Sequence, residues 1–153
     1  VSAPRLSQAA QLAIGLGATL VRDPPNAPRG PLSGIAAGLA WTQREGEDLM
    51  LVVPCDTPLL PEDLAMRLLD AIGTRQAAVA RTADGLQPLC ALWRTTLLEP
   101  LLAALAHGEH PPVRHLLLEA AAVEVSFDDA RAFANLNTPQ DLALAEQRLD
   151  RTP

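Results

Sequence analysis

Residues 49–58 read Leu-Met-Leu-Val-Val-Pro-Cys-Asp-Thr-Pro, an apolar run of strand length that ends in a proline-flanked loop holding Asp56. A continuous apolar run of this length is typical of a central parallel strand that is buried on both faces. Pro54 and Pro58 restrict the backbone on either side of the acid. We therefore expect a strand over 49–53 and a rigid loop that presents the Asp56 carboxylate at the carboxyl end of that strand.

Around this strand, segments with a helical period alternate with short apolar segments of strand length. The predicted helices cover 7–14, 32–42, 61–72, 96–106, 113–121 and 139–149, the last capped by Thr138. The predicted strands cover 18–21, 49–53, 77–81, 87–93 and 122–127. Because Asp84-Gly85 is a turn signal, the strands on its two sides are expected to pair antiparallel. This alternation predicts an α/β fold with a mostly parallel sheet and one antiparallel strand.

Length and composition are those of a single globular domain. The chain has 153 residues, of which 48% are hydrophobic and 20% charged, and its net charge is −6. This balance, with no basic run, argues against a nucleic-acid or anionic-membrane surface, because both need clustered cations. The two cysteines have no C-x-x-C spacing, and no apolar run nears the roughly 20 residues of a membrane span. We expect a cytoplasmic protein with neither nucleic acid nor membrane as a partner.

A sheet with helices on both faces binds its ligand beyond the carboxyl ends of its strands. The polar residues expected at those ends are Asp23, Asp56, Asn135 and Asn137. Asp56 is the strongest candidate, because a carboxylate in this place suits Mg²⁺ that carries phosphate oxygens. The alternative for Asp56 is a turn cap beside Thr57, and for Asp23 a turn-forming role is favoured.

Other motifs give weaker signals. Residues 30–34 read Gly-Pro-Leu-Ser-Gly and precede a helix N-terminus, whose amides attract anions or hydrogen-bond a ribose or base. The histidines His107, His110 and His115 fit no metalloenzyme spacing and are interpreted as part of a solvated turn between helices. Cys55 is interpreted as a packing residue, because no histidine is expected in a neighbouring loop to activate its thiol.

Four motifs in one order carry a resemblance to a known family. They are Arg22-Asp23 with residues 30–39, then Val-Pro-Cys-Asp-Thr-Pro at 53–58, Gln-Pro-Leu-Cys-Ala-Leu-Trp at 87–93 and Phe-Ala-Asn-Leu-Asn-Thr-Pro at 133–139. From residue 1 to about residue 144 the chain closely resembles the molybdenum cofactor guanylyltransferases, protein A of molybdopterin-guanine dinucleotide biosynthesis. The resemblance implies a three-layer, Rossmann-like nucleotidyltransferase fold. It also implies guanylyl transfer from GTP to molybdopterin with release of pyrophosphate.

The resemblance assigns roles to individual residues. It implies that Asp56 is the catalytic residue and the Mg²⁺ ligand. The nucleotide-binding residues it implies are Asp23, Gly30, Pro31, Leu32, Gly34 and Asp56. The molybdopterin-binding residues it implies are Gln87, Pro88, Asn135 and Asn137. GTP and molybdopterin are the implied substrates, and other proteins of molybdenum cofactor biosynthesis are the candidate partners.

The chain also departs from that family. The family opens with a strand and a Leu-x-Gly-Gly loop, followed by arginines and a lysine that hold the triphosphate, whereas here that loop is missing and all twelve basic residues are arginine. Where the family often has arginine after a Gly-Glu pair, this chain has His110. We interpret residues 1–153 as one N-terminally truncated nucleotidyltransferase-like domain, which alone is expected to fold poorly and to transfer no guanylyl group. The alternatives are the cytidylyltransferase of the same pathway and a non-catalytic pterin-binding or assembly module.

Overall fold

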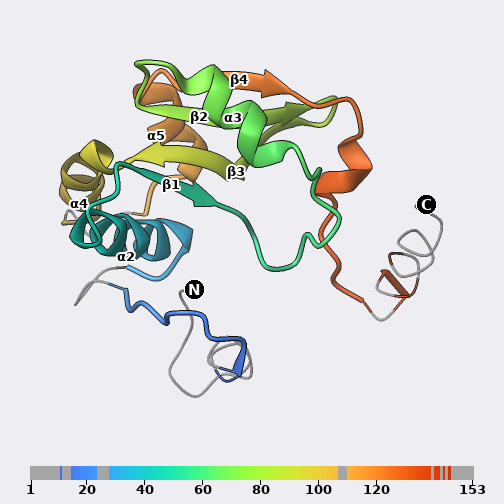
Figure 1. Ribbon diagram of the computed structural model, residues 1–153, viewed down its shortest axis with the longest axis horizontal. Helices are drawn as coiled ribbons and strands as arrows, with labels where there is room; N and C mark the ends of the chain where they lie inside the picture. The colour runs from blue at the N-terminus through green and yellow to red at the C-terminus, as the bar shows by residue number, and fades with distance from the viewer. Residues whose placement is uncertain are drawn as a thin grey trace.

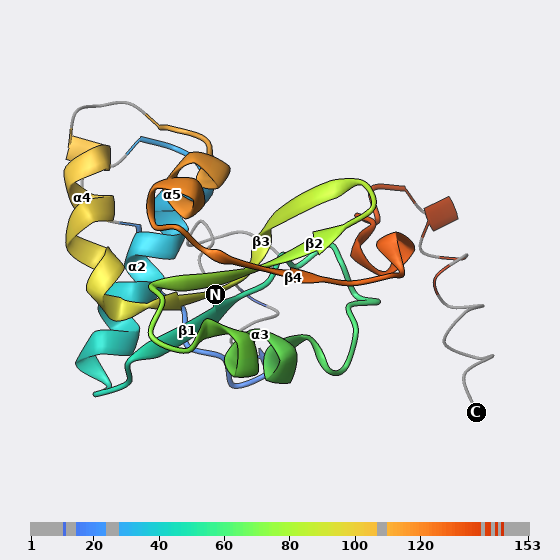
Figure 2. The ribbon, with the colours of Figure 1, turned by 90° about the horizontal axis from the view of Figure 1, so that it is seen from above.

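The computed structural model describes residues 11, 15–23, 28–106, 110–138, 140, 141, 143 and 145. Its main elements are, in chain order, α2 (Pro31–Arg44), β1 (Leu49–Val52), α3 (Leu64–Ile72), β2 (Ala77–Thr82), β3 (Gly85–Arg94), η1 (Thr95–Leu97), α4 (Leu98–Ala106), α5 (Val113–Glu119), β4 (Val123–Ser126) and η2 (Ala130–Phe133). Helices lie on both faces of one sheet, with α2, α4 and α5 on one side and α3 on the other (Figures 1 and 2). This is the predicted three-layer α/β arrangement.

The sheet has the strand order β1-β3-β2-β4. β3 pairs antiparallel with both β1 and β2, whereas β2 pairs parallel with β4. In the described sheet, three strands therefore share one direction and β3 runs against them, which confirms the prediction of a mostly parallel sheet with one antiparallel strand. The predicted turn joins β2 to β3, and Gly85 there has a φ of 116°, a conformation that glycine adopts without strain.

Each face of the sheet buries its own apolar cluster. On one face Leu39 of α2, Leu101 of α4 and Leu117 of α5 pack around Trp93. On the other face Leu64, Leu68 and Ile72 of α3 pack in one cluster with Phe127 and Phe133. The spacing of four residues places the three side chains on one face of the helix. Burying each such side chain stabilises the fold by roughly 1.5–3 kcal/mol.

Two expectations for strands were wrong. In the described part of the sheet β1 has β3 as its one neighbour, so it is an edge strand, and Leu51 and Val53 are 37% and 48% exposed. It is therefore not the central, doubly buried strand that its apolar run suggested. Residues 18–20 have no regular structure, and only Val21 takes part in an isolated bridge. An isolated bridge lacks the run of ladder hydrogen bonds that makes a strand.

The remaining predicted elements agree to within a few residues, and α5 ends at Glu119. The predicted helices 7–14 and 139–149 lie mostly outside the described residues. The Thr138 cap is confirmed, because the Asp141 N–H donates to Thr138 Oγ1 at 3.1 Å. No helix in the described ranges is long and apolar enough to cross a membrane.

Candidate functional site

The candidate site lies at the end of the sheet where β1 terminates, which is called here the carboxyl edge because the parallel strands end there. β1 follows α2 through the short turn 45–48 and runs back along it, so the N-terminus of α2 reaches the same edge as Asp56 (Figure 1). The carboxyl ends of β2 and β4 point to this edge as well, because both strands run in the direction of β1. The fold thus collects the α2 N-terminus and the strand-end loops on one side of the molecule, as expected for this class of sheet.

The loop after β1 leaves the Asp56 side chain available to a ligand. Thr57 is buried and its Oγ1 donates to the Pro54 carbonyl at 3.1 Å, so the threonine hydroxyl closes the turn. Asp56 is half-buried, and no side-chain hydrogen bond or ion pair occupies its carboxylate within the described residues. The turn-capping alternative for Asp56 is therefore not what the structure shows.

Asp56 is joined to the segment with the two asparagines. The Leu136 N–H donates to the Asp56 carbonyl at 2.8 Å, which brings residues 135–137 against the loop after β1. Leu136 is half-buried, whereas Asn135 and Asn137 are exposed. Successive residues of an extended segment point to opposite sides, so both asparagines face outward while the leucine packs inward. A cavity of about 130 Å³ opens beside Asn135 and Leu59.

A capping arrangement holds the asparagine segment from its other end. The Asp141 carboxylate accepts hydrogen bonds from the Asn137 and Thr138 N–H groups at 3.1 and 2.9 Å, while the Asp141 N–H donates to Thr138. Hydrogen bonds from the Thr138 side chain and then from these backbone N–H groups hold the pKa of Asp141 below its ordinary value. Asn137 is thus positioned through its backbone, and no described residue forms a hydrogen bond with its side chain.

The lowered pKa of Asp141 predicts acid sensitivity of this cap. A group with a depressed pKa in the folded state contributes stability above its unfolded pKa and loses it as the pH falls through the folded pKa, here below about pH 4. In an NMR titration the Asn137 and Thr138 amide signals should move together with a midpoint below the usual aspartate range. The Arg94 amide, which donates to the carbonyl of the non-titrating Gln76, is the internal control. A midpoint at or above the ordinary aspartate value, or the same titration in Asp141→Asn, would contradict the prediction.

The N-terminus of α2 is capped by a residue from a distant part of the chain. Pro31 occupies the first turn and Gly30 is the N-cap residue, with a φ of 151°. His110 Nε2 accepts a hydrogen bond from the Leu32 N–H at 3.2 Å. A Cβ atom on Gly30 would lie 2.1 Å from the same nitrogen, so glycine is required for this approach. The Ser33 hydroxyl donates to the Pro28 carbonyl and closes the loop from the other side.

His110 is the residue of this edge that the sequence interpretation missed. It was interpreted as part of a solvated turn, but it is half-buried and touches the loop expected to bind the nucleotide. The one signal for it was its place after a Gly-Glu pair, where the resembling family often has arginine.

We expect Gly30→Ala to cost more than Gly46→Ala. Both positions have positive φ values, so both substitutions carry a backbone penalty on the order of 1 kcal/mol or more. Only at Gly30 does the added methyl group meet a neighbour, and displacing His110 removes its hydrogen bond, a further loss of about 0.5–1.5 kcal/mol. Denaturant unfolding of the two variants measures the difference. Equal losses would show that the His110 contact contributes nothing to stability.

The other predicted site residues have no described contact with the loop that holds Asp56. Gln87 Nε2 donates to Thr82 Oγ1 at 3.0 Å, so the side chain is held at the end of β2, with the half-buried Pro88 beside it. The structure describes no hydrogen bond between Gln87 and residues 135–137, and their convergence on one ligand stays a prediction. Asp23 is exposed and follows residues that form no strand, so its expected place at a strand end was wrong.

The two cysteines differ in environment. Cys55, next to Asp56, is exposed, so its interpretation as a packing residue was wrong. Cys90 is 3% exposed, and burial raises the pKa of its thiol to about 11. Among the described residues, no three histidine, cysteine, aspartate or glutamate side chains gather as a metal site would need.

Comparison with known proteins identifies the family. Residues 1–123 match the model of the MobA-like NTP transferase domain. The molybdenum cofactor guanylyltransferase of Cereibacter sphaeroides is 44% identical over 135 residues, which cover 88% of this chain and 68% of that protein. The protein of the same name from Burkholderia vietnamiensis is 41% identical over 146 residues, covering 91% of this chain and 69% of its own length.

Solved structures share the fold. Molybdopterin-guanine dinucleotide biosynthesis protein A from Archaeoglobus fulgidus superposes with a TM-score of 0.69 at 21% identity, over 95% of this chain and 75% of that one. The 2-C-methyl-D-erythritol 4-phosphate cytidylyltransferase of Thermus thermophilus gives 0.64 at 20% identity, over 99% and 81%. The fold is thus one that nucleotidyltransferases use. The family model and the two relatives show that this chain belongs to the MobA-like NTP transferase family of nucleotidyltransferase enzymes.

Proposed function

We propose that this chain acts in guanylyl transfer from GTP to molybdopterin in the cytoplasm, with release of pyrophosphate. The observation that carries the proposal is the hydrogen bond from the Leu136 N–H to the Asp56 carbonyl at 2.8 Å. It sets two exposed amide side chains beside a carboxylate that has no partner in the described part of the chain. The two relatives described above are named molybdenum cofactor guanylyltransferases, which supports a guanylyl transfer to that cofactor.

The proposed nucleotide side consists of the α2 N-terminus and the loop after β1. Residues 30–34 are assigned to the guanosine by resemblance. Pro31 has no N–H, and the Leu32 and Ser33 N–H groups already donate to His110 Nε2 and to the Gly30 carbonyl, so a nucleotide would have to displace His110 to reach the Leu32 amide. Asp23 is assigned to the same ligand by resemblance. Asp56 would hold Mg²⁺, which is commonly bound by one or two carboxylates together with phosphate oxygens.

The proposed pterin side consists of Gln87, Pro88, Asn135 and Asn137. Amide side chains carry both donors and acceptors, which match the mixed edge of a pterin ring. Asn135 and Asn137 point away from the half-buried Leu136, and their backbone is held at Asp56 on one side and at Asp141 on the other. This double attachment would keep the two amides in place before the ligand arrives.

The reaction asks little covalent chemistry of the protein. An ionised oxygen of the molybdopterin phosphate attacks the α-phosphorus of GTP, the new P–O bond forms, and the bond to the β-phosphate breaks to release pyrophosphate. Bound Mg²⁺ would supply neutralisation of the charge that develops on the phosphates. The residues of this chain would hold the attacking phosphate oxygen in line with the bond that breaks. Such positioning accounts for much of the catalysis of phosphoryl transfer.

Cysteine alkylation provides the test, because Cys55 reports on Asp56 and Cys90 is a built-in control. With N-ethylmaleimide at pH 8, the exposed Cys55 should react readily, whereas the buried Cys90 should react slowly. Mg²⁺ with GTP should slow alkylation of Cys55 and leave Cys90 unchanged.

Further arms of the experiment separate the alternatives. Equal protection by CTP would favour the cytidylyltransferase. Protection by molybdopterin but by neither nucleotide would favour the pterin-binding module. Absence of protection by any of the three ligands in the full-length protein would contradict a substrate site beside Asp56.

A further inference from the structure

A second cavity lies at the opposite edge of the sheet from Asp56. Its lining includes Gln76, which directly precedes β2, Thr96, which follows β3, and Ala120, which precedes β4. Gln76 and Ala120 thus lie at the amino-terminal ends of the parallel strands β2 and β4, and Thr96 lies beside them because β3 runs in the opposite direction, whereas Asp56 follows the carboxyl end of β1. The cavity therefore does not belong to the proposed substrate site.

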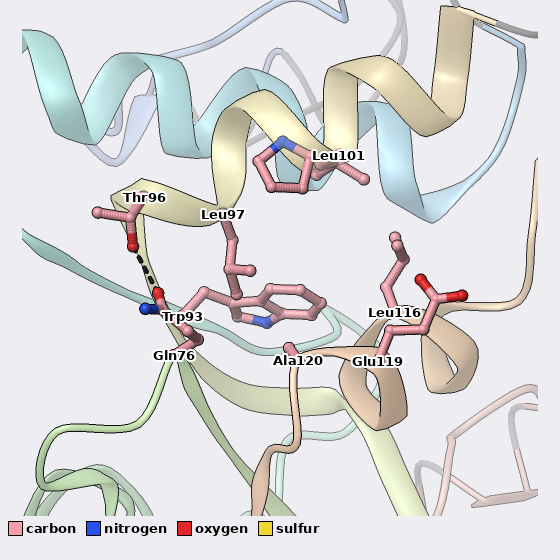
Figure 3. A pocket seen from close by; sticks show the side chains of 9 residues that line it. Gln76, Trp93, Thr96, Leu97, Leu101, Leu116, Glu119 and Ala120 are labelled. Carbon is pink, nitrogen blue, oxygen red and sulfur yellow. Dashed lines mark hydrogen bonds between the residues drawn. The ribbon is translucent and has the colours of Figure 1, made fainter.

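The walls of this cavity are mainly apolar and come from η1, α4 and α5. Leu97 and Leu101 lie on one side and Leu116 on the other (Figure 3). Pro100 also lines the cavity, which has a volume of about 400 Å³. Pockets of about 300–1,000 Å³ with mostly apolar walls and a few polar groups are typical of small-molecule sites. The size and composition fit a compact organic ligand.

The polar groups of the cavity leave one buried donor without a partner. Thr96 donates to the Gln76 side chain at 2.5 Å, so these two groups satisfy each other. Trp93 lies across the middle of the cavity in Figure 3, with its nitrogen on the ring edge nearest Ala120. The residue is 1% exposed, and its Nε1–H has no acceptor in the described structure. Buried polar groups are nearly always hydrogen-bonded, so an unpaired indole N–H at a cavity points to an acceptor supplied from outside.

We propose that this cavity binds a small, uncharged, largely apolar molecule whose hydrogen-bond acceptor, such as a carbonyl oxygen, takes the Trp93 Nε1–H. The described residues of its lining include no cation, and among them Glu119 alone is charged. An anionic ligand such as a nucleotide or a pterin phosphate is therefore disfavoured there. The site would be distinct from the site proposed for GTP and molybdopterin and independent of it.

A matched pair of probes tests the proposal on the full chain. Acetophenone and ethylbenzene have similar shapes, but only acetophenone carries a carbonyl oxygen. In NMR titrations, acetophenone should move the Trp93 indole N–H signal in a saturable way and bind about tenfold more tightly than ethylbenzene, as expected for one hydrogen bond made in a buried site. The indole of Trp41 on α2, which does not line the cavity, is the internal control.

Two variants complete the test. Ala120→Leu fills the cavity from a residue with ordinary backbone angles, and it should abolish binding of both probes. Trp93→Phe removes the donor and should cancel the advantage of acetophenone. Because Trp93 also packs in the core, the comparison of the two probes on the unaltered chain decides the outcome. No saturable shift, equal affinity for the two probes, or unchanged binding to Ala120→Leu would overturn the proposal, and a bound water alone would give the first of these results.

Discussion

Replacing Asp56 with asparagine is expected to abolish magnesium-dependent guanylyl transfer by the full-length protein. The carboxylate is half-buried, and in the described structure no hydrogen bond or ion pair engages it, so its charge is available to a metal. Asparagine keeps the shape and one oxygen but removes the charge that a hard cation requires. A metal ion that neutralises charge on the transferred phosphate lowers the activation free energy by several kcal/mol. Its loss should therefore reduce the rate about 100-fold or more.

The stability of the Asp56→Asn protein should stay within about 1 kcal/mol of the original, because the loop is held by the Thr57 hydroxyl and by the backbone bond to Leu136 rather than by the carboxylate. Asp70→Asn, on the exposed side of α3, is the matched control and should leave the rate unchanged. Initial rates over a range of Mg²⁺ concentrations measure both variants. Near-native turnover of Asp56→Asn would remove metal binding from this residue.

Local signals in the sequence predicted most of the fold, because helices and hairpins form between residues close in the chain. The antiparallel strand β3 follows from the Asp84-Gly85 turn, which acts over two residues. The place of β1 could not be predicted in the same way. An apolar run indicates burial but does not reveal how many strands will flank it, and the partner of β1 lies some forty residues further along, at Ala91 to Arg94.

The same distinction applies to the candidate site. Asp56 was found because the strand, the prolines and the acid are contiguous. His110 was not found because its contact with Leu32 joins residues 78 positions apart, and no local period encodes it. The position of Asp23 was predicted wrongly because it depended on a strand over 18–21. Those residues have β propensity, but no strand of the described sheet pairs with them, and propensity alone does not make a strand. Cys55 was misjudged because loop residues owe their exposure to the path of the chain.

Asn135→Ala and Asn137→Ala should each weaken molybdopterin binding by about tenfold or more while changing GTP binding little. Both side chains are exposed on the outer side of an extended segment, where an amide can donate to and accept from one ligand. Loss of a hydrogen bond to a charged or polar ligand group costs about 1.5–3 kcal/mol, which corresponds to that factor. Calorimetric titrations with each ligand measure the two affinities separately.

The backbone contacts of this segment make the result interpretable. The bonds to Asp56 and Asp141 use the N–H groups of Leu136, Asn137 and Thr138, which alanine substitution at either asparagine preserves. Leu136→Ala, which removes the half-buried side chain, is the contrasting control and should weaken both ligands together with stability. If the asparagine variants instead lose GTP and molybdopterin affinity equally, or lose both in step with unfolding, the amides serve only to connect η2 to the last helix and the pterin side of the site must lie elsewhere.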